Sequence, residues 1–244
     1  MKDTSEAPHL REVGRVAALY RYPVKSMAAE PLESIEVGWH GFVGDRRWAF
    51  VRGGLERSGF PWLTIRERPE MWHYQPSFTE ADRPELSTTI VRTPSGNDYD
   101  VVDPALAEEL GHGARVIKQS VGVFDTFPLS LISKQTIDGI GSIIGSDLDP
   151  LRFRPNLLIN ATTGIEFPED QWIGAVLQVG GMKMRVDKRD KRCVTVNVDP
   201  DTTVRDPAVL RAIAQSREAH LGVYGSTVET GRVSVGDPIT IVSA

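Results

Sequence analysis

The chain has almost no cysteine, since Cys193 is the only one in 244 residues. A disulfide and an all-cysteine zinc site both need more than one thiol, so neither can form within this chain. Histidine is also scarce, and no two of the five histidines stand at metal-ligand spacing, which leaves a histidine-based metal site unsupported. Cys193 therefore either works alone or is a small buried hydrophobic residue, the usual state of a lone free cysteine.

Long hydrophobic runs and an excess of positive charge are missing too. No stretch reaches the roughly 18 consecutive apolar residues of a membrane span, and residues 1–25 lack the apolar segment of a signal peptide. The formal net charge is -5, whereas binding to a phosphate backbone needs a basic surface over much of a domain. The sequence predicts a cytoplasmic protein with a reduced thiol, no membrane span and no nucleic-acid partner.

Strand-forming segments dominate what is present. Short β-branched segments bounded by Gly, Pro or Asp predict strands at residues 14–24, 32–38, 46–52, 88–93, 99–102, 114–119, 156–160, 175–180, 183–187, 193–198 and 237–242. Helices are fewer and are predicted over 104–111, over 133–145 from Ser133, and over 206–222 from Asp206 and Pro207. The pattern predicts a mainly β fold in which a few helices connect the strands.

The organisation into domains is less sharply marked. Residues 58–85 form an irregular, proline-containing passage that predicts a loop region. Turn residues at 145–156 mark a soft boundary, and a division there or slightly earlier leaves an N-terminal β lobe and a C-terminal β domain. By length alone, one large β-rich unit is an equally open alternative.

Positive charge is concentrated just before the cysteine. The segment DKRDKRCVTVNVDPDTT, residues 187–203, places two Lys and two Arg residues in the stretch that leads to Cys193. Neighbouring cations favour the thiolate, which is the form that attacks electrophiles and binds soft metals. The hypothesis is therefore that Cys193 acts as a thiolate.

Other basic and hydroxyl residues stand singly at turns beside strands. YPVKSM contains Lys25 and Ser26, GFVGDRRWAF contains Arg46, and LRFRPNLLIN has Arg154 and Asn156 on either side of a proline. The planar fork of arginine, the point charge of lysine and a hydroxyl donor suit a phosphate-bearing ligand if folding gathers them. The alternative is that each is an ordinary solvated residue at a turn or strand entry. Two further residues of this kind are Arg66 in TIRERPEM and Thr126 in DTFPLSLIS.

Eight short motifs together resemble a known family. YPVKSM, GDRRW, TIRERP, FRPN, FPEDQWIG, KRC, VDPDT and VSVGDPI occur in the order found in molybdenum cofactor sulfurase C-terminal (MOSC) domain proteins. The resemblance runs from about Val16 to Val242 and is strongest to the bacterial and mitochondrial amidoxime-reducing components. It implies a MOSC N-terminal β-barrel lobe over 11–115, a mainly β MOSC barrel domain over 116–244, and a molybdenum cofactor (Mo-molybdopterin) held between them.

The same resemblance implies an activity and a set of site residues. The activity is that of a molybdenum-dependent oxidoreductase, which reduces N-hydroxylated compounds such as amidoximes and hydroxylamines by oxygen-atom transfer to the metal. Cys193 is implied as the catalytic residue and as the protein ligand to molybdenum. A cationic surround would keep its sulfur deprotonated and neutralise the cofactor phosphate. The implied cofactor contacts are Lys25, Ser26, Arg46, Arg66, Thr126, Arg154, Asn156 and Arg192.

Partners and alternative functions complete the expectations. The sequence ends at DPITIVSA without the cysteine-rich iron-sulfur extension of some bacterial relatives, so electrons are expected from a separate protein of ferredoxin or flavin reductase type. One alternative is a carrier or sulfur-transfer protein that binds molybdenum cofactor without reductase turnover. Another is a metal-free enzyme in which the thiol of Cys193 attacks an electrophile directly.

Overall fold

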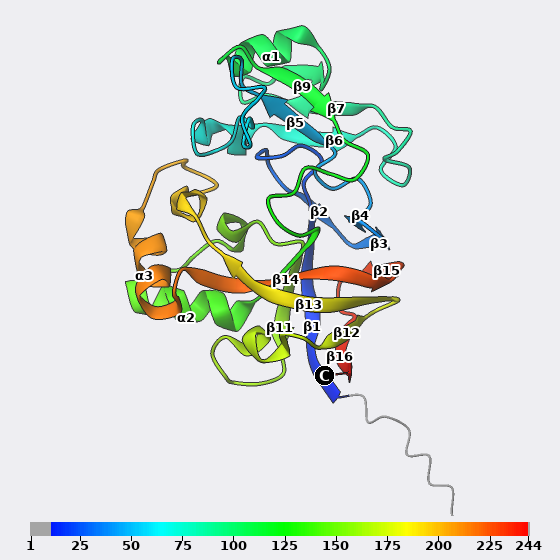
Figure 1. The fold of residues 1–244 in the computed structure, drawn as a ribbon, viewed down its shortest axis with the longest axis vertical. Coiled ribbons are helices and arrows are strands. Elements are labelled where there is room, and N and C mark those ends of the chain that lie inside the picture. The colour runs from blue at the N-terminus through cyan, green and yellow to red at the C-terminus, as the bar shows by residue number, and fades with distance from the viewer. Residues whose placement is uncertain (1–10, 244) are drawn as a thin grey trace, which may run out of the picture.

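The structure, a computed structural model, describes residues 11–243. Figure 1 shows two parts, a barrel in the lower half and a smaller lobe above it that carries β5, β6, β7, β9 and α1. The long first strand, β1, runs upward as part of the barrel wall and leads the chain into the upper lobe. The chain then returns to the barrel for its second half.

Seven strands close into the barrel. Their order is β11, β10, β14, β13, β12, β16 and β1, and the ring is complete because β1 also pairs with β11. All of these pairs are antiparallel except β10 with β11. Closure leaves no free sheet edge around the ring. The strands are β1 (Arg11–Arg21), β10 (Leu129–Ser133), β11 (Leu157–Ala161), β12 (Val176–Val179), β13 (Met182–Lys191), β14 (His220–Glu229) and β16 (Pro238–Ser243).

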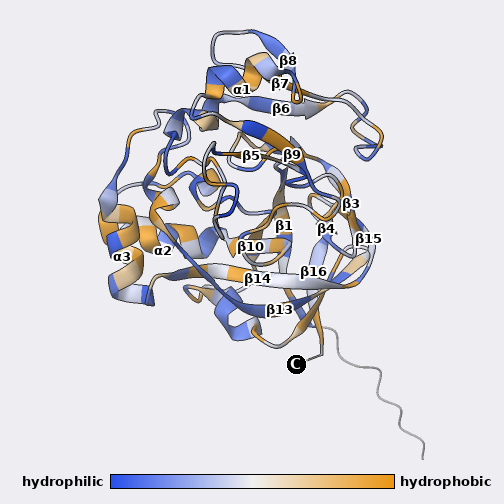
Figure 2. Cartoon of the chain, turned by 45° about the horizontal axis from the view of Figure 1, so that its top comes forward, coloured by the Kyte–Doolittle hydropathy of each residue, from blue (hydrophilic) through white to orange (hydrophobic). Residues whose placement is uncertain are grey.

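Alternation of side chains fills the barrel interior. On β13, Met182, Met184 and Val186 are buried, while the residues between them face outward, as the two-residue period of a strand requires. These outward residues are charged, and β13 is therefore largely hydrophilic in Figure 2. The inward residues of the other strands join the same core, which includes Val13, Val16, Leu19, Leu129, Leu131, Leu157, Ile159, Leu177, Val179, Val223 and Ile239.

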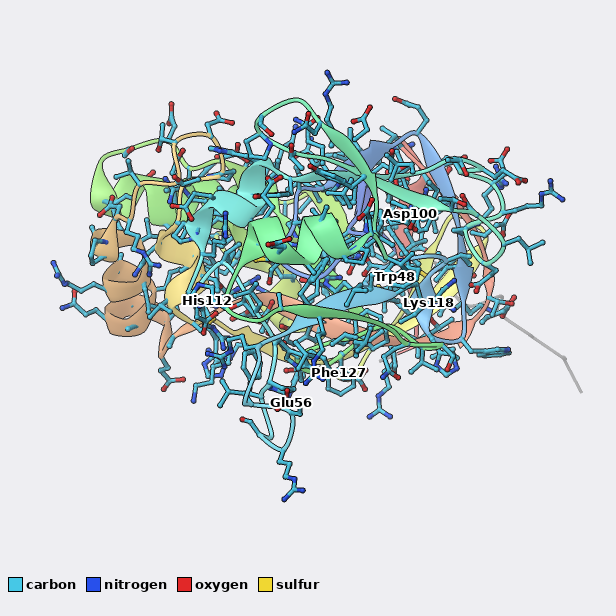
Figure 3. All side chains as sticks on the ribbon, turned by 90° about the horizontal axis from the view of Figure 1, so that it is seen from above. Trp48, Glu56, Asp100, His112, Lys118 and Phe127 are labelled. Carbon is cyan, nitrogen blue, oxygen red and sulfur yellow. The ribbon has the colours of Figure 1, made fainter. Side chains whose placement is uncertain are left out.

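Three smaller sheets accompany the barrel. Seen from above in Figure 3, Trp48 and Lys118 lie side by side on one of them, with the lysine ammonium 4.9 Å from the centre of the indole ring. Val198 from the second half of the chain packs into the core of the upper lobe, so the two parts share hydrophobic contacts. The remaining strands are β2 (Glu30–Leu32), which pairs with β1, and β3 (Ser34–Gly38), β4 (Gly41–Phe42), β5 (Trp48–Val51), β6 (Gln75–Phe78), β7 (Thr89–Arg92), β8 (Asp98–Asp100), β9 (Arg115–Lys118) and β15 (Gly231–Ser234).

Two longer helices cover one side of the barrel. These are α2 (Lys134–Ile144) and α3 (Pro207–Arg217), and both begin where the sequence predicted. The side chains of Ser133 and Asp206 accept hydrogen bonds from backbone N–H groups of the first turn, which satisfies donors that a helix start leaves free. Within residues 11–243, no helix is long and apolar enough to cross a membrane. The shorter helices are α1 (Pro104–Leu110), η1 (Pro69–His73), η2 (Pro150–Phe153), η3 (Pro168–Trp172) and η4 (Val194–Asn197).

The prediction of a mainly β barrel fold with a few connecting helices is confirmed, but one predicted strand is wrong. Residues 193–198 alternate like a strand, yet they form a short helix. The backbone N–H of Val196 donates to the carbonyl of Cys193 at 3.2 Å, and that of Val198 donates to Thr195 at 3.1 Å. These local bonds replace a strand ladder and turn the chain sharply after the cysteine.

Two further local predictions are correct only in part. The predicted helix over 206–222 stops at Arg217, because Glu218 and Ala219 take left-handed backbone angles with φ of 55° and 62°, and β14 follows. The predicted loop over 58–85 contains η1 and β6. The predicted domain boundary between residues 115 and 116 falls within β9, and the two ranges stay a prediction.

We expect the barrel core to carry much of the stability. Leu131 is 0% exposed, and Leu131→Ala should lower the free energy of unfolding by about 2–5 kcal/mol, because it removes buried methyl groups and leaves a cavity. Urea denaturation followed by circular dichroism measures this. Leu86, which is 77% exposed, is the control, and Leu86→Ala should change the free energy by less than about 0.5 kcal/mol. Equal losses in the two variants would contradict the assignment of this core.

Candidate functional site

A cavity of about 450 Å³ lies where the barrel meets the upper lobe. Its wall comes from the turn after β1, the turn before β5, the loop at 60–66, the loop before β10, the η2–β11 connection and the end of β13. The structure places all nine residues singled out in the sequence on this wall. They are Lys25, Ser26, Arg46, Arg66, Thr126, Arg154, Asn156, Arg192 and Cys193.

The cavity is strongly cationic although the whole chain carries a net charge of -5. Its positively charged lining residues are Lys25, Arg46, Arg66, Arg152, Arg154, Lys191 and Arg192. Its negatively charged lining residues are Asp125 and Asp190. Seven cations face two carboxylates. This excess favours an anionic ligand.

Cys193 lies between the end of β13 and the start of η4, is partly exposed, and lines the cavity. Its Sγ lies 3.3 Å from Nη2 of Arg66 and 3.1 Å from the hydroxyl of Thr195. Arg66 lies 127 positions earlier in the chain and belongs to the upper lobe. Burial opposes the charge of Arg66, but the sulfur of Cys193 and the carboxylate of Asp125 outweigh burial and raise the pKa of that guanidinium. The cation beside the sulfur therefore comes from outside the basic segment.

The basic segment itself is divided between several places. Lys188 lies over the ring of Phe127 at 5.4 Å, and Arg189 pairs with Glu218 at 2.7 Å. Lys191 and Arg192 do line the cavity. The pairing of β13 with β14 shifts register between Val186 and Lys188 and again between Arg189 and Lys191, so simple alternation does not set the direction of these four side chains.

Asp45 organises the turn that carries Arg46. Its carboxylate is 1% exposed, accepts the backbone N–H of Tyr22 at 2.7 Å and the side-chain amide of Asn156 at 3.1 Å, and forms an ion pair with Arg46. Asn156, whose amide N–H donates to Asp45, also accepts the backbone N–H of Ser130 at its Oδ1, at 3.2 Å. One carboxylate thus connects the end of β1, the turn before β5 and the start of β11.

Two arginines lie against the ring of Tyr22. The guanidinium carbons of Arg46 and Arg154 lie 4.7 Å and 4.1 Å from the ring centre, and that of Arg154 also lies 4.6 Å from the ring of Trp72. Arg154 takes a left-handed backbone angle with φ of 49°, which turns its side chain back toward the cavity wall. Burial and the nearby charge of Arg46 lower the pKa of Arg154 to about 10. It remains a cation at neutral pH.

Lys25 and Asp125 form an ion pair across the cavity. Nζ of Lys25 lies 2.5 Å from Asp125 and 3.2 Å from the backbone carbonyl of Val123. Burial lowers the pKa of Lys25, although Asp125 opposes this shift. For Asp125, burial is outweighed by Lys25 and Arg66, and its pKa is lowered, so its carboxyl is ionised at neutral pH. Ser26 and Thr126, the neighbours of this pair in the chain, also line the cavity.

Several buried donors in the wall have no partner. Arg192 donates from Nε to the carbonyl of Leu221 at 2.7 Å and from Nη1 to that of Phe153 at 2.8 Å, while its Nη2 is buried and unpaired. Nη2 of Arg154 and the hydroxyl of Ser130 are also buried and unpaired among the described residues. Because a buried donor without an acceptor is costly, a ligand with anionic oxygens is the kind of group that would suit these donors.

The described residues, 11–243, contain no cluster of three or more His, Cys, Asp or Glu side chains arranged to hold a metal ion. The cavity offers one thiol, which could bind a metal, and several cations, which could bind an anionic group. These groups fit a ligand that carries both its own metal and an anionic group.

Sequence reasoning missed several residues of this cavity region, among them Asp45, Asp190 and Tyr224. The role of Asp45 as an acceptor depends on partners more than 20 positions away, and nothing near it in the sequence signals them. Asp190 lies inside the basic segment, and the sequence signal that could have identified it is a single carboxylate among four cations. Tyr224 lies on β14, a strand that the sequence did not predict.

Comparison with protein families matches the MOSC domain over residues 118–240 and the MOSC N-terminal beta barrel domain over residues 13–116. The chain belongs to the MOSC domain family. This assignment agrees with the closed barrel and with the order of the sequence motifs.

Relatives of known name are distant. The chain is 25% identical to mitochondrial amidoxime-reducing component 1 of Homo sapiens, over 96% of this chain and 84% of that protein, and 23% identical to the Xenopus laevis protein of the same name, over 98% and 85%. It is 26% identical to molybdenum cofactor sulfurase of Drosophila grimshawi, over 91% of this chain but only 34% of that protein. Among solved structures, YUAD protein from Bacillus subtilis shares the fold, with a TM-score of 0.54 and 12% identity over 96% of this chain and 99% of that one.

Asp45 provides a stability test of the site. Asp45→Ala should lower the free energy of unfolding by about 3–5 kcal/mol, because it leaves the largely buried guanidinium of Arg46 without its counter-charge and leaves the N–H groups of Tyr22 and Asn156 without their acceptor. Urea denaturation measures the loss, and Asp82→Ala at an exposed aspartate is the control. A change below about 1 kcal/mol would show that Asp45 does not organise the cavity.

Proposed function

We propose that this chain is a molybdenum-cofactor-dependent reductase of N-hydroxylated compounds such as amidoximes and hydroxylamines. The observation that carries the proposal is the meeting, in one cavity, of a partly exposed thiol and two arginines, each with a guanidinium nitrogen that is buried without a partner among residues 11–243. A pterin cofactor that carries molybdenum and a phosphate supplies the groups that these donors lack. The names of the human and Xenopus relatives support the reductase activity.

Different residues of the cavity would bind different parts of the cofactor. Cys193 would be the protein ligand to molybdenum, and the unpaired Nη2 groups of Arg154 and Arg192 would donate to the phosphate. When bound, the cofactor supplies a metal that exchanges two electrons and accepts oxygen from an N–O bond. The further contacts to the pterin or its phosphate that we propose are Lys25, Ser26, Arg46, Arg66, Thr126 and Asn156.

The chain's own part in the reaction is binding and orientation. Each N–O bond that is reduced consumes two electrons and two protons and releases water. Phe60 and Phe127 offer apolar surface in the cavity for the organic part of a substrate. The ionised carboxylate of Asp125 offers an acceptor for substrate N–H groups. We propose that the electrons come from a separate protein of ferredoxin or flavin reductase type.

Metal content tests the assignment of Cys193. Protein made in a host that synthesises the cofactor should contain about one molybdenum per chain, and Cys193→Ala should lose most of it, because the metal loses its protein ligand. Elemental analysis after gel filtration measures this. Cys193→Ser is the conservative companion and should retain less metal than the natural chain, because an alkoxide is a harder ligand and forms less readily than a thiolate. Full metal content in Cys193→Ala would remove this residue from the metal site.

An assay with a chemical electron donor separates the reductase from a carrier. The relative named molybdenum cofactor sulfurase favours this second candidate, in which the chain binds the cofactor without turnover. Metal-loaded protein should reduce a simple amidoxime to the amidine with reduced viologen as donor, and Cys193→Ala should not. Metal-loaded protein without any turnover would support the carrier, and turnover in molybdenum-free protein that is abolished by alkylation of Cys193 would support a metal-free thiol enzyme.

Arg154 tests the proposed phosphate contact. Arg154→Ala should keep the fold and weaken cofactor retention by about 10–100-fold, because a hydrogen bond to a charged group contributes about 1.5–3 kcal/mol. Dialysis followed by molybdenum analysis measures retention. The matched control is Arg232→Ala, at an exposed arginine that pairs with Glu36. If both variants keep the same metal content, Arg154 is not a cofactor contact.

A further inference from the structure

Asp190 is a buried carboxyl group at the edge of the cavity that the proposed cofactor contacts do not use. It lies near the end of β13, is 2% exposed, and belongs to the cavity wall. Its carboxylate lies 2.8 Å from Nη1 of Arg192. A buried charge of this kind persists only while a partner of opposite charge compensates it.

The guanidinium of Arg192, which neutralises Asp190, is also the group that we propose to bind the anionic ligand. Arg192 uses Nε and Nη1 for protein carbonyls and for Asp190, and Nη2 is its one nitrogen without an acceptor among the described residues. An anion at Nη2 would therefore place a second negative charge on a guanidinium that already neutralises Asp190. In a buried setting, two anions on one cation disfavour the charged form of the carboxyl group.

Charged and titratable groups from several elements also act on Asp190. Tyr224 on β14 and Arg46 from the turn before β5 stabilise its carboxylate, whereas Asp125 from the loop before β10 opposes it. Burial is the largest influence and raises the pKa of Asp190 to about 6. The neutral form is therefore accessible near neutral pH before any ligand enters. No histidine is among the described residues that line the cavity.

We propose that an anion binding in this cavity is taken up together with a proton on Asp190, so that this carboxyl group makes the affinity for the anionic ligand depend on pH. The inference rests on the anion-binding role proposed above and extends it to a residue that touches the ligand only through Arg192. Asp190 is therefore a positioning residue for the site.

The sign of the effect follows from the proton balance. Below pH about 6 Asp190 is already neutral, and the anion gains the full charge of Arg192. As the pH rises above that value, binding must recruit a proton, and the affinity falls by up to about tenfold per pH unit. The fall ends where the pH exceeds the pKa of Asp190 in the complex.

Sulfate is a suitable probe because it is a dianion that does not titrate near neutral pH. Isothermal calorimetry on the full chain, made in a host without molybdenum cofactor, measures sulfate affinity between about pH 5.5 and about pH 8. The natural chain should lose affinity with rising pH by up to about tenfold per unit, whereas Asp190→Asn should bind with little pH dependence and more tightly at the upper end. Arg154→Ala should weaken binding at every pH, which locates the sulfate in the cavity.

A matched control and a second measurement keep the test decisive. Glu169 is as buried as Asp190 but lies outside the cavity lining, so Glu169→Gln should keep the pH dependence of the natural chain. If Asp190→Asn does not fold, titrations of the natural chain in two buffers of different ionisation heat count the protons directly. They should show uptake of up to about one proton per sulfate at pH values above 6.

The outcomes separate this inference from the proposed function. Sulfate that fails to bind, binds without proton uptake, or keeps its pH dependence in Asp190→Asn overturns the coupling, even if the metal-loaded protein is an active reductase. Proton-linked sulfate binding that disappears in Asp190→Asn supports the coupling, even if no N-hydroxylated compound is reduced.

Discussion

The buried carboxylate of Asp45 is the interaction on which the cavity depends. It fixes three segments that are distant in sequence, because it accepts from Tyr22 and Asn156 and neutralises Arg46 at the same time. The ring of Tyr22, held in this way, then supports the guanidinium groups of Arg46 and Arg154. Aromatic faces, backbone carbonyls and the carboxylates of Asp45, Asp125 and Asp190 together compensate the charge of this wall.

Charge in this molecule is segregated. The chain as a whole is acidic, yet the cavity gathers seven cations against two carboxylates. Arginine predominates among these cations, and its planar group can stack on a ring with one face and donate along its edge. The arrangement leaves one nitrogen each of Arg154 and Arg192 buried and unpaired among the described residues, as the proposed binding of anionic oxygens requires.

The sequence predicted the parts of this site that depend on short-range rules. The barrel fold follows from strand alternation and turn residues, and two helix starts follow from Ser133 and Asp206. Residues of the motifs reach one cavity because each stands at a turn beside a strand, although their roles stay predictions. The rest depends on tertiary partners. Nothing local pairs the sulfur of Cys193 with Arg66, and the alternation after Cys193 indicated a strand where backbone bonds close a helical turn.

Closure of the barrel brings the two ends of the described chain together. Arg11 at the start of β1 pairs with Ile241 of β16, so the chain enters and leaves on neighbouring strands, on the opposite side of the barrel from the upper lobe. Both described ends therefore leave the barrel on one side, away from the junction of the two parts. Ends that lie close together are the geometry in which domains tolerate circular permutation and insertion into another chain.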